Sequence, residues 1–351
     1  MPIATAAYNL LEAGALDALA SSEPERLRYR PEGGAYLNLM RLPLEPLPEI
    51  DDEKIARLCR VVRGFAFAAV DGAKSGHPGG SSSKTEQVVT LLASGALAFD
   101  PRNPKHPGRD RVVWSAGHCT PLFHAVLALI YDTLRSQGVT APAEAEETAV
   151  YPEDLARFRR FDGPSGHVES SYAFTDTSTG SSGHGFSAGL GFAVLHRSCG
   201  LPARVFVIAG DAETEEGMSY EARNLASNLG IDNLLVTLDY NNFGIDGPIT
   251  DVLPSPYLNH WFASGWNMIE VDGHNVLELA YAYRLAAALV LAPVVWYAGF
   301  MWLHKTTQHL IVDLNLQWSV ARDPWYAPAL IVWTVCIIAA AVLVAWPRSR
   351  L

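Results

Sequence analysis

Two short apolar runs of strand length, joined by a helical pattern, constrain the fold of this chain most strongly. The apolar runs are residues 204–209 and 233–239, and residues 216–229 between them have the pattern of a helix. A strand, a helix and a strand in this order form a βαβ unit, which requires a parallel sheet with a right-handed crossover. Ligands of such sheets bind at the carboxyl ends of the strands, so a site is expected after residues 209 and 239.

Helical patterns around this unit predict an α/β fold in which helices flank the parallel sheet. In residues 51–72, apolar side chains recur at spacings of three and four from Ile55 to Ala69, which marks one buried helix face. Similar patterns occupy residues 85–98, 121–135 and 186–199. A glycine-rich turn is expected at residues 75–83, between the first two helices.

Oxygen donors follow both strands of the βαβ unit. Gly210-Asp211-Ala212 comes after the first strand, and Asn241 and Phe243 come after the second. The carboxylate of Asp211, the amide oxygen of Asn241 and the backbone carbonyl of Phe243 form a hard oxygen set that suits Mg²⁺. The alternative is that these segments only cap a helix and form a turn. Their place on adjacent strand ends favours the metal site.

The C-terminal part of the chain differs in charge from the rest. Of the net charge of −11, residues 286–351 carry +2, so the remainder carries −13. Uncharged runs occupy residues 285–303 and 324–347, and 19 helical residues span roughly 29 Å, close to the ~30 Å core of a bilayer. We expect two transmembrane helices here, with a pair of buried core helices as the alternative. The expected organisation is an arm at 1–50, a domain at 51–280 and a membrane hairpin at 281–351.

Charge and cysteine usage also limit the partners and the compartment. A net charge of −11 excludes a basic nucleic-acid binder. Positive charges flank the two uncharged runs at Arg284, Arg348 and Arg350, which favours a cytoplasmic domain attached to the cell membrane. The first 20 residues lack a basic region before an apolar run, so no secretory signal is expected. The four scattered cysteines are typical of a reducing compartment.

Several motifs, in one order along the chain, resemble the transketolase family. The segment from Gly210-Asp211 to Asn241-Asn242 resembles a thiamine diphosphate binding motif, and Lys74-Ser75-Gly76-His77-Pro78-Gly79-Gly80 resembles the family's signature. Further motifs in the family's order are Asp100-Pro101, Arg109-Asp110-Arg111, Ser115-Ala116-Gly117-His118, Gly166-His167, Thr179-Gly180, Glu216-Gly217, Glu221-Ala222 and Ile245-Asp246-Gly247. The resemblance covers about residues 55–280 and is to the family's N-terminal, diphosphate-binding domain.

The resemblance implies thiamine diphosphate and Mg²⁺ as cofactors and assigns roles to single residues. Asp211, Asn241 and the Phe243 carbonyl would bind the metal. The residues that would bind the cofactor are His118, Gly180, Ser181, Gly210, Asp211, Ala212 and Asn241. His77 and His167 would face substrate hydroxyls, where an imidazole of near-neutral pKa can move a proton. Glu221 matches a position at the contact between cofactor sites, although a solvated helix charge explains it equally well.

The chain also departs from the family's pattern. Ala212 stands where a second glycine is usual, and Ser181-Ser182 with His184 replace a Pro-Leu pair and a glutamine. After residue 275 the family continues into a pyrimidine-binding domain, which brings the glutamate that activates the cofactor's aminopyrimidine. This chain becomes apolar there, so it is expected to hold half of an active site.

Two functions fit these observations. The first is the diphosphate-binding subunit of a split transketolase, which transfers two-carbon ketol units between sugar phosphates. Such a subunit needs a chain with the pyrimidine domain as its partner and is expected to be part of an oligomer. The second is a non-catalytic, membrane-anchored or truncated protein that binds the cofactor.

Overall fold

The predicted βαβ unit is present in the computed structural model of the chain. Strand β4 (Val205–Gly210) is followed by helix α7 (Gly217–Asn228) and strand β5 (Leu234–Asp239), and the two strands pair in parallel from Val205 opposite Leu234 to Gly210 opposite Asp239. Strand β3 (Arg111–Trp114), which was not predicted, pairs in parallel with β4, so the sheet order is β3-β4-β5. The strand ends therefore lie where the sequence predicted them, within one residue.

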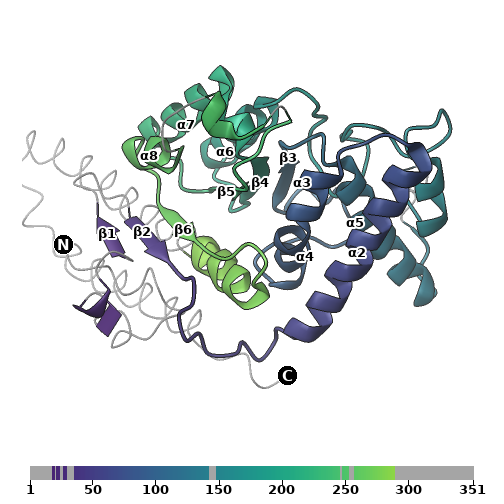
Figure 1. The fold of residues 1–351 in the computed structure, drawn as a ribbon, viewed down its shortest axis with the longest axis horizontal. Coiled ribbons are helices and arrows are strands. Elements are labelled where there is room, and N and C mark those ends of the chain that lie inside the picture. Colours follow the sequence, from purple (N-terminus) through teal and green to yellow (C-terminus); the bar gives the residue numbers. More distant parts are fainter. Residues whose placement is uncertain are drawn as a thin grey trace, which may run out of the picture. The chain divides into compact units, whose positions relative to one another are not determined.

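Helices cover both faces of this sheet (Figure 1). Val112 and Trp114 pack into one core cluster with helices α2 (Asp52–Ala73), α4 (Thr85–Ala93) and α5 (Thr120–Ser136). Val113, between them, packs into a second cluster with helix α6 (His184–Ser198) and helix α7. Alternate side chains of a strand point to opposite faces, so the sheet is buried on both sides, as parallel sheets are.

Two features near the start of the domain differ from the prediction, and the start of helix α2 agrees with it, each for a local reason. Helix α4 ends at Ala93 instead of residue 98, because Gly95 has a φ of +72° and ends the helical path. The predicted turn at 75–83 contains a short helix, α3 (Pro78–Ser83), with Pro78 at its first position. Helix α2 begins where Asp51 accepts a hydrogen bond from the Lys54 N–H at 2.8 Å, close to the predicted start.

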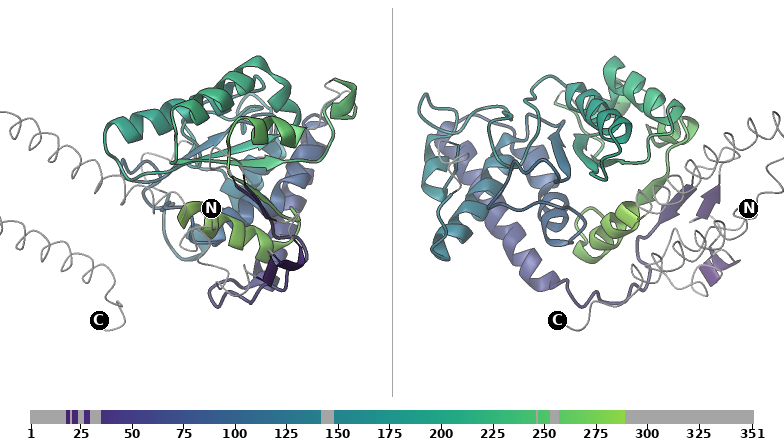
Figure 2. Two further views of the ribbon diagram at one scale, coloured as in Figure 1. Left: turned by 90° about the vertical axis from the view of Figure 1, so that its left-hand side faces the viewer. Right: turned by 180° about the vertical axis from the view of Figure 1, so that it is seen from behind.

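Residues before 51 contribute strands, which the prediction of an arm did not include. Strand β1 (Leu27–Tyr29) pairs antiparallel with β2 (Ala35–Asn38), and β2 pairs in parallel with β6 (Met268–Glu270). Figure 2 shows β2 beside β6 in two further views. Strands of three or four residues are too short for a reliable alternation of apolar and polar side chains, so they leave no recognisable pattern in the sequence. The short helix α8 (Tyr257–Ala263) precedes β6.

The structure describes residues 18–19, 21–23, 27–29, 35–141, 148–245, 247–252 and 257–288. No helix in these ranges is long and apolar enough to cross a membrane. The second predicted membrane span, at 324–347, lies outside the described residues, and the first overlaps them only at 285–288. These four residues lie in a helix that is described from 276 to 288 and packs on the domain: Leu285 is fully buried beside Leu37 and Leu39.

His124 on α5 should make the stability of the fold sensitive to acid. Its ring is fully buried against Phe123, Phe158 and Tyr172, with Nε2 2.9 Å from the Ser165 carbonyl oxygen. Burial lowers the pKa of His124 from its usual 6.5 to about 4. The unfolded chain takes up this proton at higher pH than the folded chain, so about 2 to 3 kcal/mol of stability should be lost as the pH falls from 7 to 4.5.

The variant His124→Gln tests this, because glutamine does not titrate and can still donate to the Ser165 carbonyl. Urea unfolding at pH 7 and pH 4.5 should show a smaller loss of stability for His124→Gln than for the wild-type chain. Equal losses in the two chains would contradict a buried, neutral His124.

Candidate functional site

Asp211 lies at the carboxyl end of β4, where the sequence predicted a metal ligand. Its side chain is buried, with Oδ1 accepting a hydrogen bond from the Ala212 N–H at 2.9 Å and Oδ2 accepting one from the Asn242 N–H at 2.6 Å. Burial raises the pKa of Asp211 above its usual value, against the effect of these two hydrogen bonds. The second bond ties the carboxylate to the loop that follows β5, so the two strand ends form one site.

The loop after β5 carries the other two predicted metal ligands. The Asn241 amide nitrogen donates to Asp239 Oδ2 at 2.9 Å, and Asn241 Oδ1 accepts from the Phe243 N–H at 2.9 Å. Asn242 has a φ of +65°, a left-handed conformation that asparagine tolerates, and this turns the chain sharply after the strand. The side chain of Phe243 is exposed and carries no donor atom, so only its backbone carbonyl can serve as a ligand.

These donors fit Mg²⁺ by their chemistry, because one carboxylate, one amide and one carbonyl offer three hard oxygens within a short loop pair. Within the described ranges, no group of three or more His, Cys, Asp or Glu side chains is arranged to hold a metal. A metal at the sheet edge would therefore depend on the amide and backbone oxygens as well as on Asp211.

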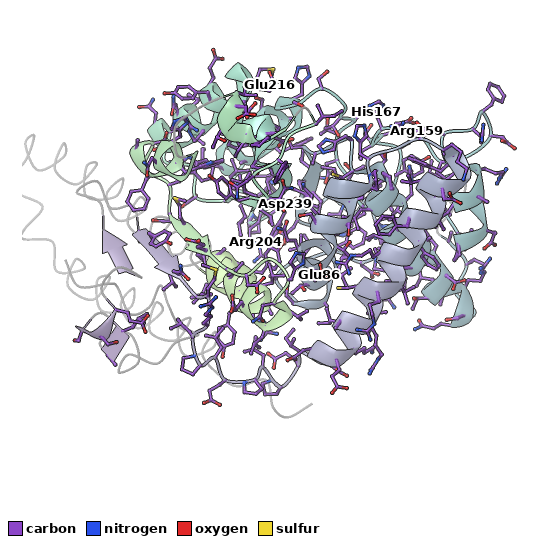
Figure 3. The ribbon with its side chains drawn as sticks, viewed as in Figure 1. Glu86, Arg159, His167, Arg204, Glu216 and Asp239 are labelled. Atoms are coloured by element: carbon purple, nitrogen blue, oxygen red, sulfur yellow. The ribbon has the colours of Figure 1, made fainter. Side chains whose placement is uncertain are left out.

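Three predicted histidines gather beside this edge. His77 precedes helix α3, and its ring centroid lies 5.4 Å from that of His118, which follows β3. A Cβ atom placed on Gly180 would lie 3.2 Å from the ring of His167, so this glycine and this ring are in close contact. Figure 3 labels His167, together with Asp239 at the end of β5. The structure thus brings His77 beside His118 and His167 beside Gly180.

Two of these histidines are held neutral near pH 7. Burial, with the nearby charge of Lys84, lowers the pKa of His118 to about 4. Burial, with the charge of Arg159, also lowers the pKa of His77. A neutral imidazole has one donor and one acceptor nitrogen, so His77 and His118 can hydrogen-bond to hydroxyl or amine groups in either direction.

The departures from the family's pattern are accommodated without backbone strain. In the described part of the chain, the residues other than glycine with positive φ are Arg41, Lys74, Arg159 and Asn242, so Ala212 does not need a glycine's conformation. Ser181 is exposed and precedes helix α6. Gly183 begins that helix with a φ of +79°, where a side chain would be strained, and the sequence keeps glycine there.

Two charged residues of the site were not predicted. Lys84 is 1% exposed, and its Nζ lies 2.9 Å from Asp239 Oδ2. Glu213 is also buried, and burial raises its pKa to about 7. Nothing in the sequence marks either residue as buried. Lys84 follows three serines, and Glu213 lies in the strongly acidic segment 211–216, and both contexts are typical of a solvated surface.

Comparison with known proteins decides the family. The family model for the thiamine diphosphate binding domain of transketolase matches residues 54–295, about two thirds of the chain. The chain belongs to the transketolase family. It is similar to the crystal structure of transketolase from Campylobacter jejuni, with a TM-score of 0.59 and 26% identity over 68% of this chain and 36% of that one. This agrees with the parallel sheet flanked by helices.

The curated relatives differ in how much of their length this transketolase domain covers. Over 234 residues, 64% of the chain, it is 34% identical to the "6-deoxy-6-sulfo-D-fructose transketolase subunit SqwG" of Clostridium sp. (strain MSTE9), and the match covers 77% of that subunit. It is 32% identical to human transketolase over 69% of the chain, but only 37% of the human protein is covered. The transketolase of Rhodobacter capsulatus is covered to 33%. The chain thus spans about a third of these longer enzymes.

The variant Gly117→Ala should weaken thiamine diphosphate binding. A Cβ at Gly117 would lie 2.7 Å from Thr179 Oγ1 and 2.8 Å from the Gly180 nitrogen, so the segment at 179–180 must move. We expect a loss of about 1 to 3 kcal/mol in stability and weaker cofactor binding, measured by urea unfolding and calorimetric titration. Gly191→Ala on α6 is the matched control, since its Cβ would meet nothing within 4 Å. Equal behaviour of the two variants would contradict a close contact at Gly117.

Proposed function

We propose that the chain is the diphosphate-binding subunit of a transketolase-like enzyme, which transfers two-carbon ketol units between sugar phosphates. The observation that carries this proposal is the retained set of metal donors and histidines at one edge of the sheet, in a chain that covers 77% of a transketolase subunit. The enzyme would be complete only with a second chain that supplies the pyrimidine domain. The cofactor would lie between the two chains of an oligomer.

Each residue of the site has a defined part in this proposal. Thiamine diphosphate, when bound, supplies the carbon nucleophile that attacks the ketose carbonyl. Asp211, Asn241 and the Phe243 carbonyl would hold Mg²⁺, while His118 and the segment at 180–181 would contact the cofactor. Gly210 and Ala212 would bring the backbone close to it.

His77 and His167 act on the substrate side. The described structure holds His77 half-buried and His167 exposed, and the pKa of His77 is lowered by burial, so its neutral ring can accept a proton from a sugar hydroxyl and return it. The His77 ring lies beside His118, and the His167 ring lies beside Gly180, which supports the proposal that both histidines serve as acid–base groups next to the cofactor.

The test is reconstitution of ketol transfer from purified chains. The full chain is mixed with a pyrimidine-domain chain, thiamine diphosphate and Mg²⁺, and transfer between a ketose phosphate and an aldose phosphate is followed. We expect activity from the mixture and none from either chain alone. Each pyrimidine-domain chain that is encoded beside this one is tested in turn. If the chain binds the cofactor but transfers no ketol unit with any of them, a non-catalytic binding protein is favoured instead.

We also propose that the uncharged run at 324–347 attaches the chain to the cell membrane, with the domain in the cytoplasm. Its 24 residues would span roughly 36 Å as a helix, enough for a bilayer core. The first uncharged run, at 285–303, is less suited to span a bilayer. Residues 285–288 belong to the helix that packs on the domain, and the remaining 15 residues would span roughly 22 Å. Recovery of the chain in membranes after alkaline washing supports attachment, and recovery in the soluble fraction overturns it.

A further inference from the structure

A buried cation lies beside the proposed cofactor site. Lys84 joins helices α3 and α4, and its side chain is 2% exposed. Its Nζ lies 3.6 Å from the position of a Cβ on Gly80 and 3.5 Å from the position of one on Gly210. The ammonium group therefore lies between the glycine-rich segment after His77 and the carboxyl end of β4. Lysine is almost never fully buried unless its charge is paired.

The partner of this cation is Asp239, the last residue of β5. Asp239 Oδ2 accepts hydrogen bonds from Lys84 Nζ and from the Asn241 amide nitrogen, both at 2.9 Å, and Oδ1 accepts one from the Ser83 hydroxyl at 2.7 Å. Burial disfavours a charged ammonium group, but the neighbouring Cys119 and Asp239 raise the pKa of Lys84. A carboxylate on a side chain that is 6% exposed would be costly without such a cation.

The pair also fixes which way the Asn241 amide points. Its nitrogen is a donor and its oxygen an acceptor, and only the nitrogen can bond to the Asp239 carboxylate. The oxygen is therefore directed to the opposite side, where it accepts from the Phe243 N–H in the loop that Asp211 also binds through Asn242. A flipped amide would point its oxygen at a carboxylate and offer a metal two hydrogen atoms.

We propose that the Lys84–Asp239 ion pair is a positioning element that holds the Asn241 amide oxygen toward the magnesium ion. The inference rests on the proposed function, since it concerns the metal that would bind the diphosphate. Partners that orient a metal ligand typically change metal affinity by about 10- to 100-fold when they are removed. Lys84 acts through Asp239 and is not itself a catalytic residue.

The test measures the Mg²⁺ concentration that gives half-maximal thiamine diphosphate binding to the full chain, by calorimetric titration. Lys84→Met should raise this concentration by about 10- to 100-fold, because the buried carboxylate loses its cation and no longer holds the amide. Lys84→Met with Asp239→Asn should recover most of the loss, since the neutral amide oxygen introduced at position 239 still accepts from the Asn241 amide. Lys84→Met with Asp239→Leu should remain weak, since leucine offers no acceptor.

A matched control is Arg204→Met, which breaks the largely buried ion pair with Asp110 at the opposite end of β4. It should lower stability and leave the half-maximal Mg²⁺ concentration unchanged. Equal Mg²⁺ dependence of the two double variants would overturn the positioning role, and this comparison stands even where Lys84→Met alone does not fold. If the wild-type chain binds thiamine diphosphate and Lys84→Met needs the same Mg²⁺ concentration for it, only this inference is overturned. If the wild-type chain binds no thiamine diphosphate, the proposed function is overturned as well.

Discussion

Asp211→Asn is expected to weaken Mg²⁺-dependent binding of thiamine diphosphate by at least about 100-fold, which corresponds to about 2.7 kcal/mol. The carboxylate is buried at the end of β4 and is the single charged group among the three expected metal ligands. Asparagine has the same shape, but its amide nitrogen cannot accept a hydrogen bond. The side chain therefore keeps only one of the two bonds from the Ala212 and Asn242 N–H groups, and the charge on the metal ligand is lost. Calorimetric titration at saturating Mg²⁺ measures the effect.

Asp132→Asn is the control for this substitution. Asp132 lies half exposed on α5, where it pairs with Arg135 within the same helix, so its charge contributes to a surface ion pair of small energy. We expect wild-type cofactor affinity for Asp132→Asn. Wild-type affinity for Asp211→Asn as well would remove Asp211 from the metal site.

His77→Gln is expected to lower kcat/KM for ketol transfer in the reconstituted enzyme by about 10²- to 10⁴-fold, the usual contribution of an acid–base group. The affinity for thiamine diphosphate should change little, because His77 reaches the cofactor region through its edge contact with His118. Steady-state kinetics and a parallel cofactor titration give the two values for each variant.

The control for His77→Gln is His106→Gln, because His106 is exposed and its ring accepts a hydrogen bond from the Gly108 N–H in its own turn. Full activity is expected for that variant. A loss of cofactor affinity as large as the loss of activity in His77→Gln would show that His77 serves binding instead of proton transfer.

The sequence predicts the centre of this fold well because the information is local there. Residues 205–210 and 234–239 are short apolar runs on either side of a helical pattern, and burial on both faces of a parallel sheet requires such runs. Their ends fix the places of Asp211 and Asn241, so the positions of the expected metal donors could be predicted from spacing. The three histidines followed from the family's motifs and not from spacing.

Other parts depend on contacts between distant segments and could not be predicted. Strand β2 forms because Leu37 packs near Tyr281 and Leu285, more than 240 residues away in the chain, and pairs with β6. Lys84 is buried because Asp239 lies opposite it, 155 residues further on. In a sequence, a lysine of this kind has the pattern of a surface residue, since only the fold supplies its partner.

The most direct test of a working diphosphate-binding subunit is a titration of thiamine diphosphate into the purified full chain, with Mg²⁺ or with EDTA. Thiamine, which lacks the diphosphate, serves as the matched ligand. We expect binding in the micromolar range, about −8 kcal/mol, that requires both Mg²⁺ and the diphosphate. Absence of binding, or equal binding of thiamine and thiamine diphosphate in EDTA, would contradict a diphosphate and metal site at the ends of β4 and β5.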